Sequence, residues 1–585
     1  MERHDNIDTK TGVALFLRVL AYAKPYGLFI FIAILSIVAV TVLNLLEPFL
    51  IKVAIDECIL KNDLDRLLRI SLYYLAAIFL SFVFTFAQEY SLSITGQKII
   101  YGIRKDVYHH IASRSTQYFD NSPIGRLTTR ATNDIENLNE MYTALFVSFF
   151  QDFFMIIGIF ILMLSQSLKL SSLCIFVIPP MIFFTIRFRF ENQPLFRKAR
   201  AVLAAINASL NEYISGMTVI QTFKKETVVY DKFKRKNEEY FEINNKQTRA
   251  MAMFRPSIEL LRYVAMALLI FFGGKFVLEG SVEFGTLFMF TSLIGRFFKP
   301  ILDLTEKYNI LQAAISSSER IFTVLDDKRE IPNPPSPVPM KNFKGKIEFK
   351  NVWFAYNDED WVLKDISFII NPGESAAFVG ATGAGKSSII NLITRFYDCQ
   401  RGEILIDGVD IKKLDKHELR KNISVVQQEV FLFSGTISDN IRLFDKKITD
   451  NTVKSVSEYV NASKFIEKLP KGYEETITEK GATLSAGERQ LLSFARTLAH
   501  EPLLLVLDEA TANIDTETEL LIKDALGKIL KDRTAIAVAH RLSTIQNADK
   551  IIVLKQGRII EEGNNETLLA LKGTYYDLYK LQYKD

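Results

Sequence analysis

The residues Gly380-Ala-Thr-Gly-Ala-Gly-Lys-Ser387 match the pattern G-x-x-x-x-G-K-[ST]. An apolar run, Ser375–Val379, precedes them, and a helical pattern, Ser388–Ile393, follows them. A strand, a loop of small residues and a helix in this order form a phosphate-binding loop, because the backbone N–H groups can turn toward an anion. The sequence therefore predicts a nucleoside triphosphate site, with Lys386 on the β- and γ-phosphates and Ser387 on Mg²⁺. Its members are Gly380, Ala381, Thr382, Gly383, Ala384, Gly385, Lys386, Ser387 and Ser388.

A pair of carboxylates would complete such a site. The apolar run Leu503–Leu507 is followed directly by Asp508 and Glu509. A buried strand with this ending would place Asp508 beside Mg²⁺ and Glu509 near the γ-phosphate, where it can polarise the attacking water. Acidic pairs are common at strand ends, so the interpretation depends on finding Lys386 in the same chain. Together these residues predict an ATPase site.

More than one domain must position these residues. At 585 residues the chain exceeds the size of a single core. It is 49% hydrophobic and 24% charged, which is reconciled if the apolar residues are concentrated in one part of the chain. The net charge of +4 gives no argument for a nucleic-acid partner. The three cysteines, Cys58, Cys174 and Cys399, share no metal-ligand spacing and indicate no redox role.

The apolar residues concentrate in the first half of the chain. Its apolar segments each come near the ~20 residues that a helix needs to cross a bilayer. They are Gly27–Ile51, Ile70–Ala87, Ala144–Ser165, Leu168–Ile186, Tyr263–Leu278 and Phe284–Leu302. So many apolar runs would not fit inside one globular domain. The sequence therefore predicts an all-α transmembrane domain of about six helices.

Two long polar stretches, at roughly residues 89–143 and 187–262, interrupt the apolar segments. They are rich in Lys and Arg and keep helical periodicity, so we expect them to extend the membrane helices into the cytoplasm. An even number of crossings returns the second half to the side of the N-terminus. We therefore expect a multi-pass protein of the inner (plasma) membrane, with its N-terminus and its nucleotide site in the cytoplasm.

A proline-rich run, Pro332–Pro339, marks the boundary between the two halves. Short alternating hydrophobic stretches begin after it, at Lys346–Val352, which is typical of a soluble α/β domain. The predicted organisation is an N-terminus with an amphipathic helix at 1–26, a transmembrane domain at 27–320, a linker at 321–345 and a phosphate-loop α/β domain at 346–585.

Further motifs resemble those of ATP-binding-cassette (ABC) proteins. Leu484-Ser-Ala-Gly-Glu488 is similar to the signature motif of that family. The other matching positions are the Q-loop glutamine Gln428, the switch histidine His540, the D-loop residue Asp515 and the adenine-stacking aromatic residue Tyr356. The segment pattern of the first half and the run Tyr118–Arg126 resemble the half-transporters of ABC exporters, which place the membrane domain before the cassette.

This resemblance implies how the residues act. Gln428 would contact Mg²⁺ and report to the membrane domain, and His540 would hold the γ-phosphate and orient Glu509. The implied catalytic residues are Glu509, His540 and Gln428, the metal ligands are Ser387, Gln428 and Asp508, and the cofactors are ATP and Mg²⁺. In this family the signature, here Leu484, Ser485, Ala486, Gly487 and Glu488, contacts the ATP held by the other cassette of a dimer.

Two residues depart from the family signature, Leu-Ser-Gly-Gly-Gln. Ala486 adds a Cβ where the backbone approaches phosphate, and Glu488 puts a carboxylate near a polyanion unless it points away. The chain's own Lys386, Asp508 and Glu509 are intact. This combination resembles the subunit of heterodimeric exporters that bears the catalytic glutamate. It favours a heterodimer, and a homodimer with a mildly altered signature remains the alternative.

The sequence thus predicts ATP-driven export of hydrophobic or amphiphilic compounds, drugs or lipids, by alternating access in a dimeric transporter. The alternatives are a lipid flippase and a regulatory ATP-binding membrane subunit that gates a partner. Asp152 favours a cationic amphiphile as cargo, whereas Glu47, Arg296 and Lys299 either line the cargo site or pair with one another. Short helices at Asn121–Thr129 and near Gly216–Phe223 are expected to dock on the cassettes.

Overall fold

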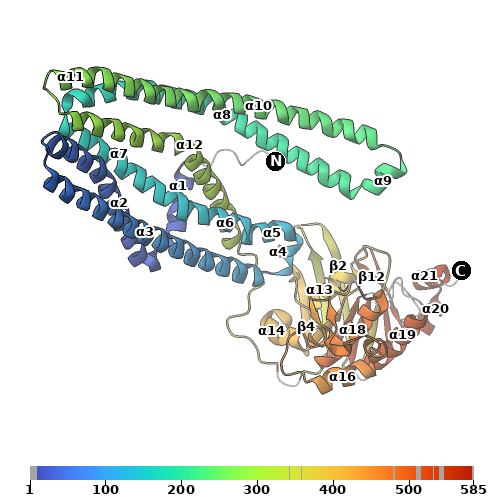
Figure 1. Ribbon diagram of the computed structural model, residues 1–585. Coiled ribbons are helices and arrows are strands. Elements are labelled where there is room, and N and C mark those ends of the chain that lie inside the picture. Colours follow the sequence, from blue (N-terminus) through green and yellow to red (C-terminus); the bar gives the residue numbers. More distant parts are fainter. Residues whose placement is uncertain are drawn as a thin grey trace. The chain divides into compact units, whose positions relative to one another are not determined.

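The computed structural model describes residues 9–340, 343–357, 359–478, 481, 483–508, 516–530, 533–538 and 546–582 (Figure 1). The chain divides into two compact units. The first comprises the residues up to Ala112 together with Ile124–Asp327. The second comprises Ser113–Pro123 together with the residues from Lys328 onward, so a short insertion between two helices of the first unit belongs to the second.

The first unit is helical, as its apolar segments predict. Its helices are α1 (Thr9–Ala21), α2 (Gly27–Val53), α3 (Leu64–Ala112), α5 (Ile124–Ala131), α6 (Asn133–Glu140), α7 (Phe146–Gln166), α8 (Leu168–Ser215), α9 (Met217–Thr222), α10 (Glu226–Leu268), α11 (Gly274–Leu278) and α12 (Phe284–Leu325). Among the described residues, five helical segments are long and apolar enough to cross a membrane: Lys24–Ile59, Leu64–Ala112, Ile124–Gln166, Leu168–Ser215 and Glu226–Leu278. The predicted sixth segment lies within α12.

The long polar stretches continue the membrane helices as rods. α3 runs on to Ala112 and α8 to Ser215, while α10 begins at Glu226. α8 and α10 lie side by side, and the short helix α9 joins them at the tip (Figure 1). The rings of Phe188 and Phe254 stack between them, with centroids 4.2 Å apart. α12 continues to Leu325, past the predicted end of the transmembrane domain at 320.

The second unit contains two main sheets. Its strands are β1 (Ile347–Ala355), β2 (Trp361–Ile370), β3 (Ser375–Val379), β4 (Arg401–Ile406), β5 (Val409–Asp410), β6 (Ile423–Val426), β7 (Gly435–Thr436), β8 (Thr476–Ile477), β9 (Leu504–Asp508), β10 (Thr534–Val538), β11 (Lys550–Lys555) and β12 (Arg558–Gly563). One sheet has the order β2-β1-β4-β5 and is antiparallel. The larger sheet has the order β12-β11-β3-β10-β9-β6, in which β11, β3, β10, β9 and β6 are parallel. β7 and β8 form a separate pair.

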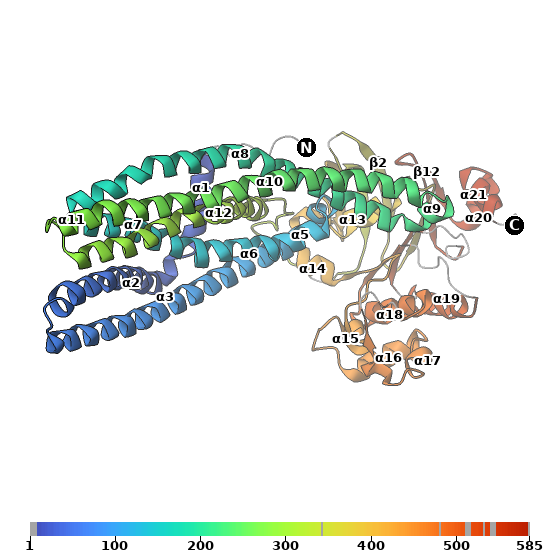
Figure 2. The same ribbon diagram turned by 45° about the horizontal axis from the view of Figure 1, so that its top comes forward.

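The helices of the second unit are α13 (Lys386–Ile393), α14 (Lys416–Lys421), α15 (Ile437–Arg442), α16 (Asp450–Tyr459), α17 (Ser463–Ile466), α18 (Ala486–Ala499), α19 (Thr516–Leu530), α20 (Asn565–Leu571) and α21 (Thr574–Gln582), and the inserted segment adds α4 (Thr116–Asp120). α14 and α18 pack against β6 of the larger sheet, and α20 packs against β12. α15, α16 and α17 gather beside α18 (Figure 2). The proline-rich run is held along this unit, because the Val338 N–H donates to the Lys413 carbonyl at 2.9 Å and Asn333 donates to Asp415 at 2.7 Å.

Candidate nucleotide and transport sites

The predicted phosphate loop lies between β3 and α13. β3 is an interior strand, and Ala376–Val379 are buried, so the loop leaves the sheet from a rigid base. Lys386 is the first residue of α13 and is 5% exposed. Its ammonium donates to the carbonyls of Gly380 and Ala381, at 2.7 and 3.1 Å, which curls the side chain back over the loop. Ser387, Thr382 and Gly383 are exposed at the rim, where a ligand can reach them.

At two positions of the loop only glycine fits, because neighbouring strands lie too close to the loop backbone to leave room for a Cβ atom. Gly380 has φ +155°, and a Cβ built on it would lie 2.2 Å from the Leu554 carbonyl oxygen. Gly385 has φ +101°, and its Cβ would lie 2.5 Å from a Leu363 methyl carbon. The loop is therefore wedged between β11 and the start of β2. The first turn of α13 directs its N–H groups into the loop, an arrangement that favours an anion.

The remaining motif residues follow neighbouring parallel strands. In the order β3-β10-β9-β6, the phosphate loop follows β3, Asp508 ends β9, and Gln428 lies two residues after β6. Val538, which ends β10, stands beside both Phe378 and Asp508 in the register. Because parallel strands end at one edge of a sheet, these groups converge on the crevice where such sheets bind ligands. Glu509, Asp515 and His540 lie outside the described residues.

Tyr356 follows β1 and points toward α13. Its hydroxyl lies 3.1 Å from the Ser388 hydroxyl, and Asn391 donates to it at 3.0 Å. Ser388 itself is 4% exposed. The aromatic residue that the sequence predicts to stack on adenine is therefore bonded to the helix that starts at the phosphate loop. The ring of Tyr397 meets Tyr356 edge-on, and the Tyr397 hydroxyl in turn donates to Asp120; the sequence analysis did not single out either of these two residues.

The signature segment begins α18. Ser485 is the N-cap, and its hydroxyl oxygen accepts from the Glu488 N–H at 3.2 Å. The Glu488 carboxylate accepts from the Ser485 N–H at 2.8 Å, which completes a capping box. Leu484 and Gly487 are buried, while Ser485 and Ala486 are exposed. Glu488 thus points back onto its own helix, the second of the two orientations considered from the sequence.

The sequence carries a signal for this arrangement. Ser485-Ala-Gly-Glu488 fits the capping-box pattern S-x-x-E, which predicts reciprocal bonds at a helix start. Glu488 therefore has a structural use at the start of α18, although it departs from the family signature. Since the Ser485 oxygen is the acceptor in the cap, the hydroxyl proton can still be donated to a ligand.

Polar groups in the membrane segments pair with one another. Arg296 donates to Glu47 at 2.5 Å and to the Asn44 carbonyl at 2.7 Å, and the Tyr74 hydroxyl donates to Glu47 at 3.1 Å. A cavity of about 210 Å³ lies next to this group, lined by Leu43, Asn44, Glu47, Tyr74, Ala77, Ile78 and Ser81. Of the two possibilities for Glu47 and Arg296, the structure therefore shows mutual pairing, with the carboxylate bordering a cavity.

Asp152 forms an ion pair with Lys307. Its charge is therefore balanced within the first unit, and this removes the argument that a free carboxylate selects a cationic cargo. The sequence could not reveal the pair, because the two residues are 155 positions apart. Lys307 also lies beyond the last predicted apolar segment, so the sequence gives no reason to count it among the charged residues of the membrane segments.

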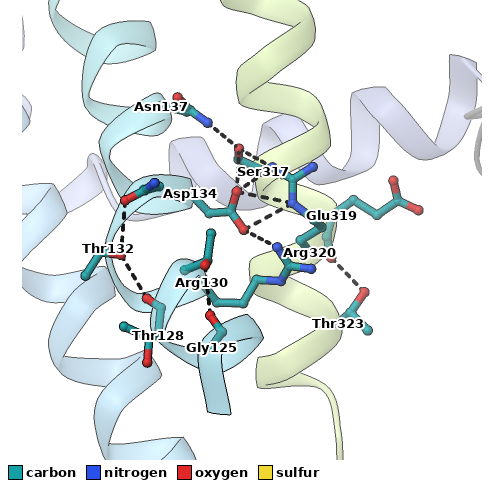
Figure 3. A network of polar contacts seen from close by, with 12 residues as sticks. Gly125, Thr128, Arg130, Thr132, Asp134, Asn137, Ser317, Glu319, Arg320 and Thr323 are labelled. Atoms are coloured by element: carbon teal, nitrogen blue, oxygen red, sulfur yellow. Dashed lines mark hydrogen bonds and ion pairs between the residues drawn. The ribbon is translucent and has the colours of Figure 1, made fainter. Parts of the chain in front are cut away.

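A polar network joins α6 to α12 (Figure 3). Asp134 of α6 is 2% exposed and accepts from Arg130 at 2.6 Å. It also accepts from the Nε of Arg320 on α12, at 3.1 Å, and from the Ser317 hydroxyl at 3.1 Å. Asn137 donates to Ser317 at 2.9 Å. A buried carboxylate with two guanidinium partners holds these helices in one register.

Two family descriptions match the two parts of the chain. "ABC transporter transmembrane region" matches residues 30–301, and "ABC transporter" matches residues 363–512. The first match covers the membrane segments, and the second covers the phosphate loop, the signature and Asp508. Together they agree with a helical unit followed by a nucleotide-binding unit.

Named relatives are similar over most of their length. "Probable multidrug resistance ABC transporter ATP-binding/permease protein YheH" of Bacillus subtilis is 40% identical over 506 residues, 86% of this chain and 75% of the relative. An "ATP-dependent lipid A-core flippase" of Syntrophus aciditrophicus is 34% identical over 571 residues, 98% of this chain and 95% of the relative. Among solved structures, that of a bacterial Atm1-family ABC exporter with ATP bound has a TM-score of 0.78 at 26% identity, covering 95% of this chain and 98% of the other.

Proposed function

Because this chain belongs to the ABC transporter family and carries an exporter-type transmembrane region and an ATP-binding cassette on one polypeptide, we propose that it exports hydrophobic or amphiphilic compounds as one half of a dimer. It is an integral membrane protein and an ATP hydrolase coupled to transport. The observation that carries the proposal is the convergence of the phosphate loop, Asp508 and the segment with Gln428 at one edge of a parallel sheet.

The residues of this edge divide the work of ATP hydrolysis. Lys386 exchanges its bonds to Gly380 and Ala381 for the β- and γ-phosphates, and Tyr356 stacks on the adenine. Glu509 orients and polarises the attacking water, and His540 holds the γ-phosphate and positions Glu509. Ser387, Gln428 and Asp508 offer hydroxyl, amide and carboxylate oxygens, a donor set that suits Mg²⁺. Mg²⁺ held by these three residues would supply positive charge against the negative charge that develops on the phosphates.

The site is completed by a second cassette. Ser485 and the N-terminus of α18 donate to the γ-phosphate of the ATP that the partner's phosphate loop holds, so ATP joins the two cassettes. Ala486 adds a methyl group at this contact, and Glu488 places a negative charge at the start of α18 where the consensus has a neutral glutamine. A signature with this added bulk and negative charge serves its partner's site less well than a consensus signature. This supports a heterodimer in which this chain holds the hydrolysing site, and a homodimer remains the alternative.

The cargo is recognised through apolar surface. The charges of Glu47 and Asp152 are balanced by Arg296 and Lys307, so neither favours a cation. Phenylalanines at 149, 150, 153 and 154 follow one another along α7, with ring contacts at 5.9, 6.3 and 5.8 Å. Drugs or lipids with flat or aliphatic parts match such a wall. Alternating access moves them across the inner membrane, with the N-terminus and the cassette in the cytoplasm.

A lipid flippase is the second candidate within transport. It is favoured by the relative named as a lipid A-core flippase, which matches 98% of this chain. A regulatory subunit that only binds ATP is the candidate from another class. The carboxylate at Glu509 argues against it, since a cassette that only gates a partner does not need a group to polarise water.

Reconstitution in liposomes separates these candidates. Probes would be an NBD-labelled phosphatidylethanolamine for lipid translocation and Hoechst 33342 for export of an amphiphilic drug, each with and without ATP–Mg²⁺. We expect ATP-dependent movement of one or both probes, and its loss in Glu509→Gln. ATP hydrolysis that moves neither probe would contradict the export proposal, whereas lipid movement alone would select the flippase.

A further inference from the structure

An open groove of about 610 Å³ lies between α11 and the first turn of α12. Its walls are apolar side chains from α11, from the start of α12 and from the π-helical turn Leu269–Gly273 that joins α10 to α11. Phe271, Leu278 and Phe284 are exposed members of these walls. Lys275 is the one charged residue in the lining. The groove is therefore an exposed apolar surface that carries a single cation.

Two adjacent glycines shape the groove. A Cβ built on Gly273 would lie 2.5 Å from a methyl carbon of Leu287, so the chain packs directly against α12 at this position. Gly274 lines the groove, and a Cβ built on it would meet nothing within 4 Å. The pair therefore brings the two helices together on one side and leaves open space on the other.

The groove lies at the end of a membrane-crossing segment. The apolar segment Glu226–Leu278 ends there, at the end of α10 that is remote from α9 (Figure 1). Apolar side chains in the last turns of such a segment face the acyl chains of lipids, whereas a lysine near its end extends toward the headgroups. The apolar walls and Lys275 thus match the two parts of a phospholipid molecule.

The charges around Lys275 leave its ammonium available to an anion. Its acidic neighbour is Glu279, at 3.8 Å, and both side chains of this pair are more than half exposed, so the pair is weak. Glu283, the residue before α12, lies 3.4 Å from Lys52 instead. A second ammonium, that of Lys169, lies 5.5 Å from the centre of the Phe276 ring. The end of α11 is therefore a cationic neighbourhood.

We propose that this groove binds an anionic phospholipid, with one acyl chain against Phe271 and Gly274 and the phosphate on Lys275. An acyl chain covers the apolar walls, and the phosphate replaces Glu279 as the partner of the ammonium. This lipid is a resident of the membrane domain. The site requires only that the chain spans a membrane, so it is independent of the export function proposed above.

Quenching of tryptophan fluorescence by brominated lipids tests the proposal on the full chain in liposomes. The chain's two tryptophans, Trp353 and Trp361, lie in the second unit, so a tryptophan introduced by Phe271→Trp reports on the groove alone. The probes are phosphatidylglycerol and phosphatidylcholine, each with brominated acyl chains. We expect quenching at this position to show a preference for phosphatidylglycerol of about fivefold, the effect typical of one basic side chain near anionic lipid.

Phe79→Trp is the matched control. Phe79, on α3, is 65% exposed, as against 69% for Phe271, and it lies outside the groove. Because the preference is a ratio between two lipids at one position, a difference in depth between the two tryptophans cancels. We expect Phe79→Trp to show no preference between the two lipids.

Two further substitutions, each made in the Phe271→Trp protein, separate the groove from its cation. Lys275→Gln removes the charge and should abolish the preference, and Lys275→Arg should retain it. Gly274→Leu fills the open space with a side chain that the helix accepts, so it should also abolish the preference although Lys275 is still present.

Three results would overturn the proposal. A preference that persists in Gly274→Leu would mean that Lys275 attracts lipid without the groove. An equal preference at Phe79→Trp would mean that the whole membrane domain attracts anionic lipid. If neither brominated lipid quenches the tryptophan of Phe271→Trp, protein, such as a second half-transporter, covers the groove.

Discussion

The Arg320 guanidinium donates from Nε to both carboxylate oxygens of Asp134, at 3.2 and 3.1 Å. The two residues are 186 positions apart, on α12 and α6, and Asp134 is almost fully buried. Arg130, near the end of α5, forms a second ion pair with the same carboxylate. This group ties the helix that leads out of the first unit to the helix that follows α5.

Asp134→Asn should lower the thermal stability of the protein in nanodiscs. The substitution leaves two guanidinium groups around a neutral amide, and breaking a buried ion pair costs about 3–5 kcal/mol at full burial. Arg320 is 38% exposed, so we expect the lower end of that range. The control is Glu238→Gln, which breaks an exposed pair with Lys234 and should have little effect. Equal apparent melting temperatures for both variants would show that the network does not hold the helices.

Glu488→Gln should increase the ATPase rate of any site that uses this signature. Glutamine keeps the capping box, because its side-chain oxygen can still accept from the Ser485 N–H, but the negative charge near the phosphate is removed. Glu488→Ala should instead weaken the start of α18 by about 1 kcal/mol, a typical cost of losing a cap. Steady-state ATPase assays on both variants check this. A lower rate in Glu488→Gln would mean that the carboxylate has a positive role.

Glu47→Gln should disturb the first unit less than Arg296→Met. The introduced glutamine can still accept from Tyr74 and Arg296, whereas loss of the guanidinium leaves a carboxylate in the membrane segment without its cation. The Glu47 side chain borders the 210 Å³ cavity. In Glu47→Gln we therefore expect the transport rate of Hoechst 33342, or of the labelled lipid, to depend differently on the concentration of that probe. An unchanged dependence for both probes would exclude this cavity from the cargo route.

The cassette should lose stability as the pH falls below about 6.5. Burial lowers the pKa of His500, which follows α18, from its ordinary value of 6.5. The folded state therefore disfavours the protonated form that the unfolded chain takes up, so stability is present above pH 6.5 and declines below it. His500→Gln should flatten this decline, and His417→Gln, at an exposed position, should not. Parallel pH profiles for all three proteins would contradict the assignment.

The local motifs were predictable because their geometry is local. The phosphate loop needs only a strand, small residues and a helix that follow one another in the sequence. The structure has β3, the segment Gly380–Gly385 and α13 in this order. The same holds for the membrane helices, whose length and composition alone identify them. The place of Asp508 at the end of β9 was predictable from the apolar run before it, because a carboxylate is costly to bury and therefore lies at the edge of the sheet.

The pairings across the fold were not predictable. Lys307 with Asp152, Arg320 with Asp134 and Tyr397 with Asp120 each join segments more than a hundred residues apart. The hydrophobic periodicity of a single sequence shows which face of a helix is apolar, but it does not show which other helix packs against that face. Glu488 is different, because the S-x-x-E spacing of Ser485 and Glu488 is local and is itself a signal for the capping box.

The most direct test of the account is the ATPase rate of the purified chain in nanodiscs, measured for the unmodified protein and for Glu509→Gln. Glu501→Gln, at an exposed position after α18, is the matched control. The account predicts turnover that falls by about 100-fold or more in Glu509→Gln, the contribution typical of a positioned base, and stays unchanged in Glu501→Gln. ATP turnover by the unmodified protein that continues at the same rate in Glu509→Gln would contradict it.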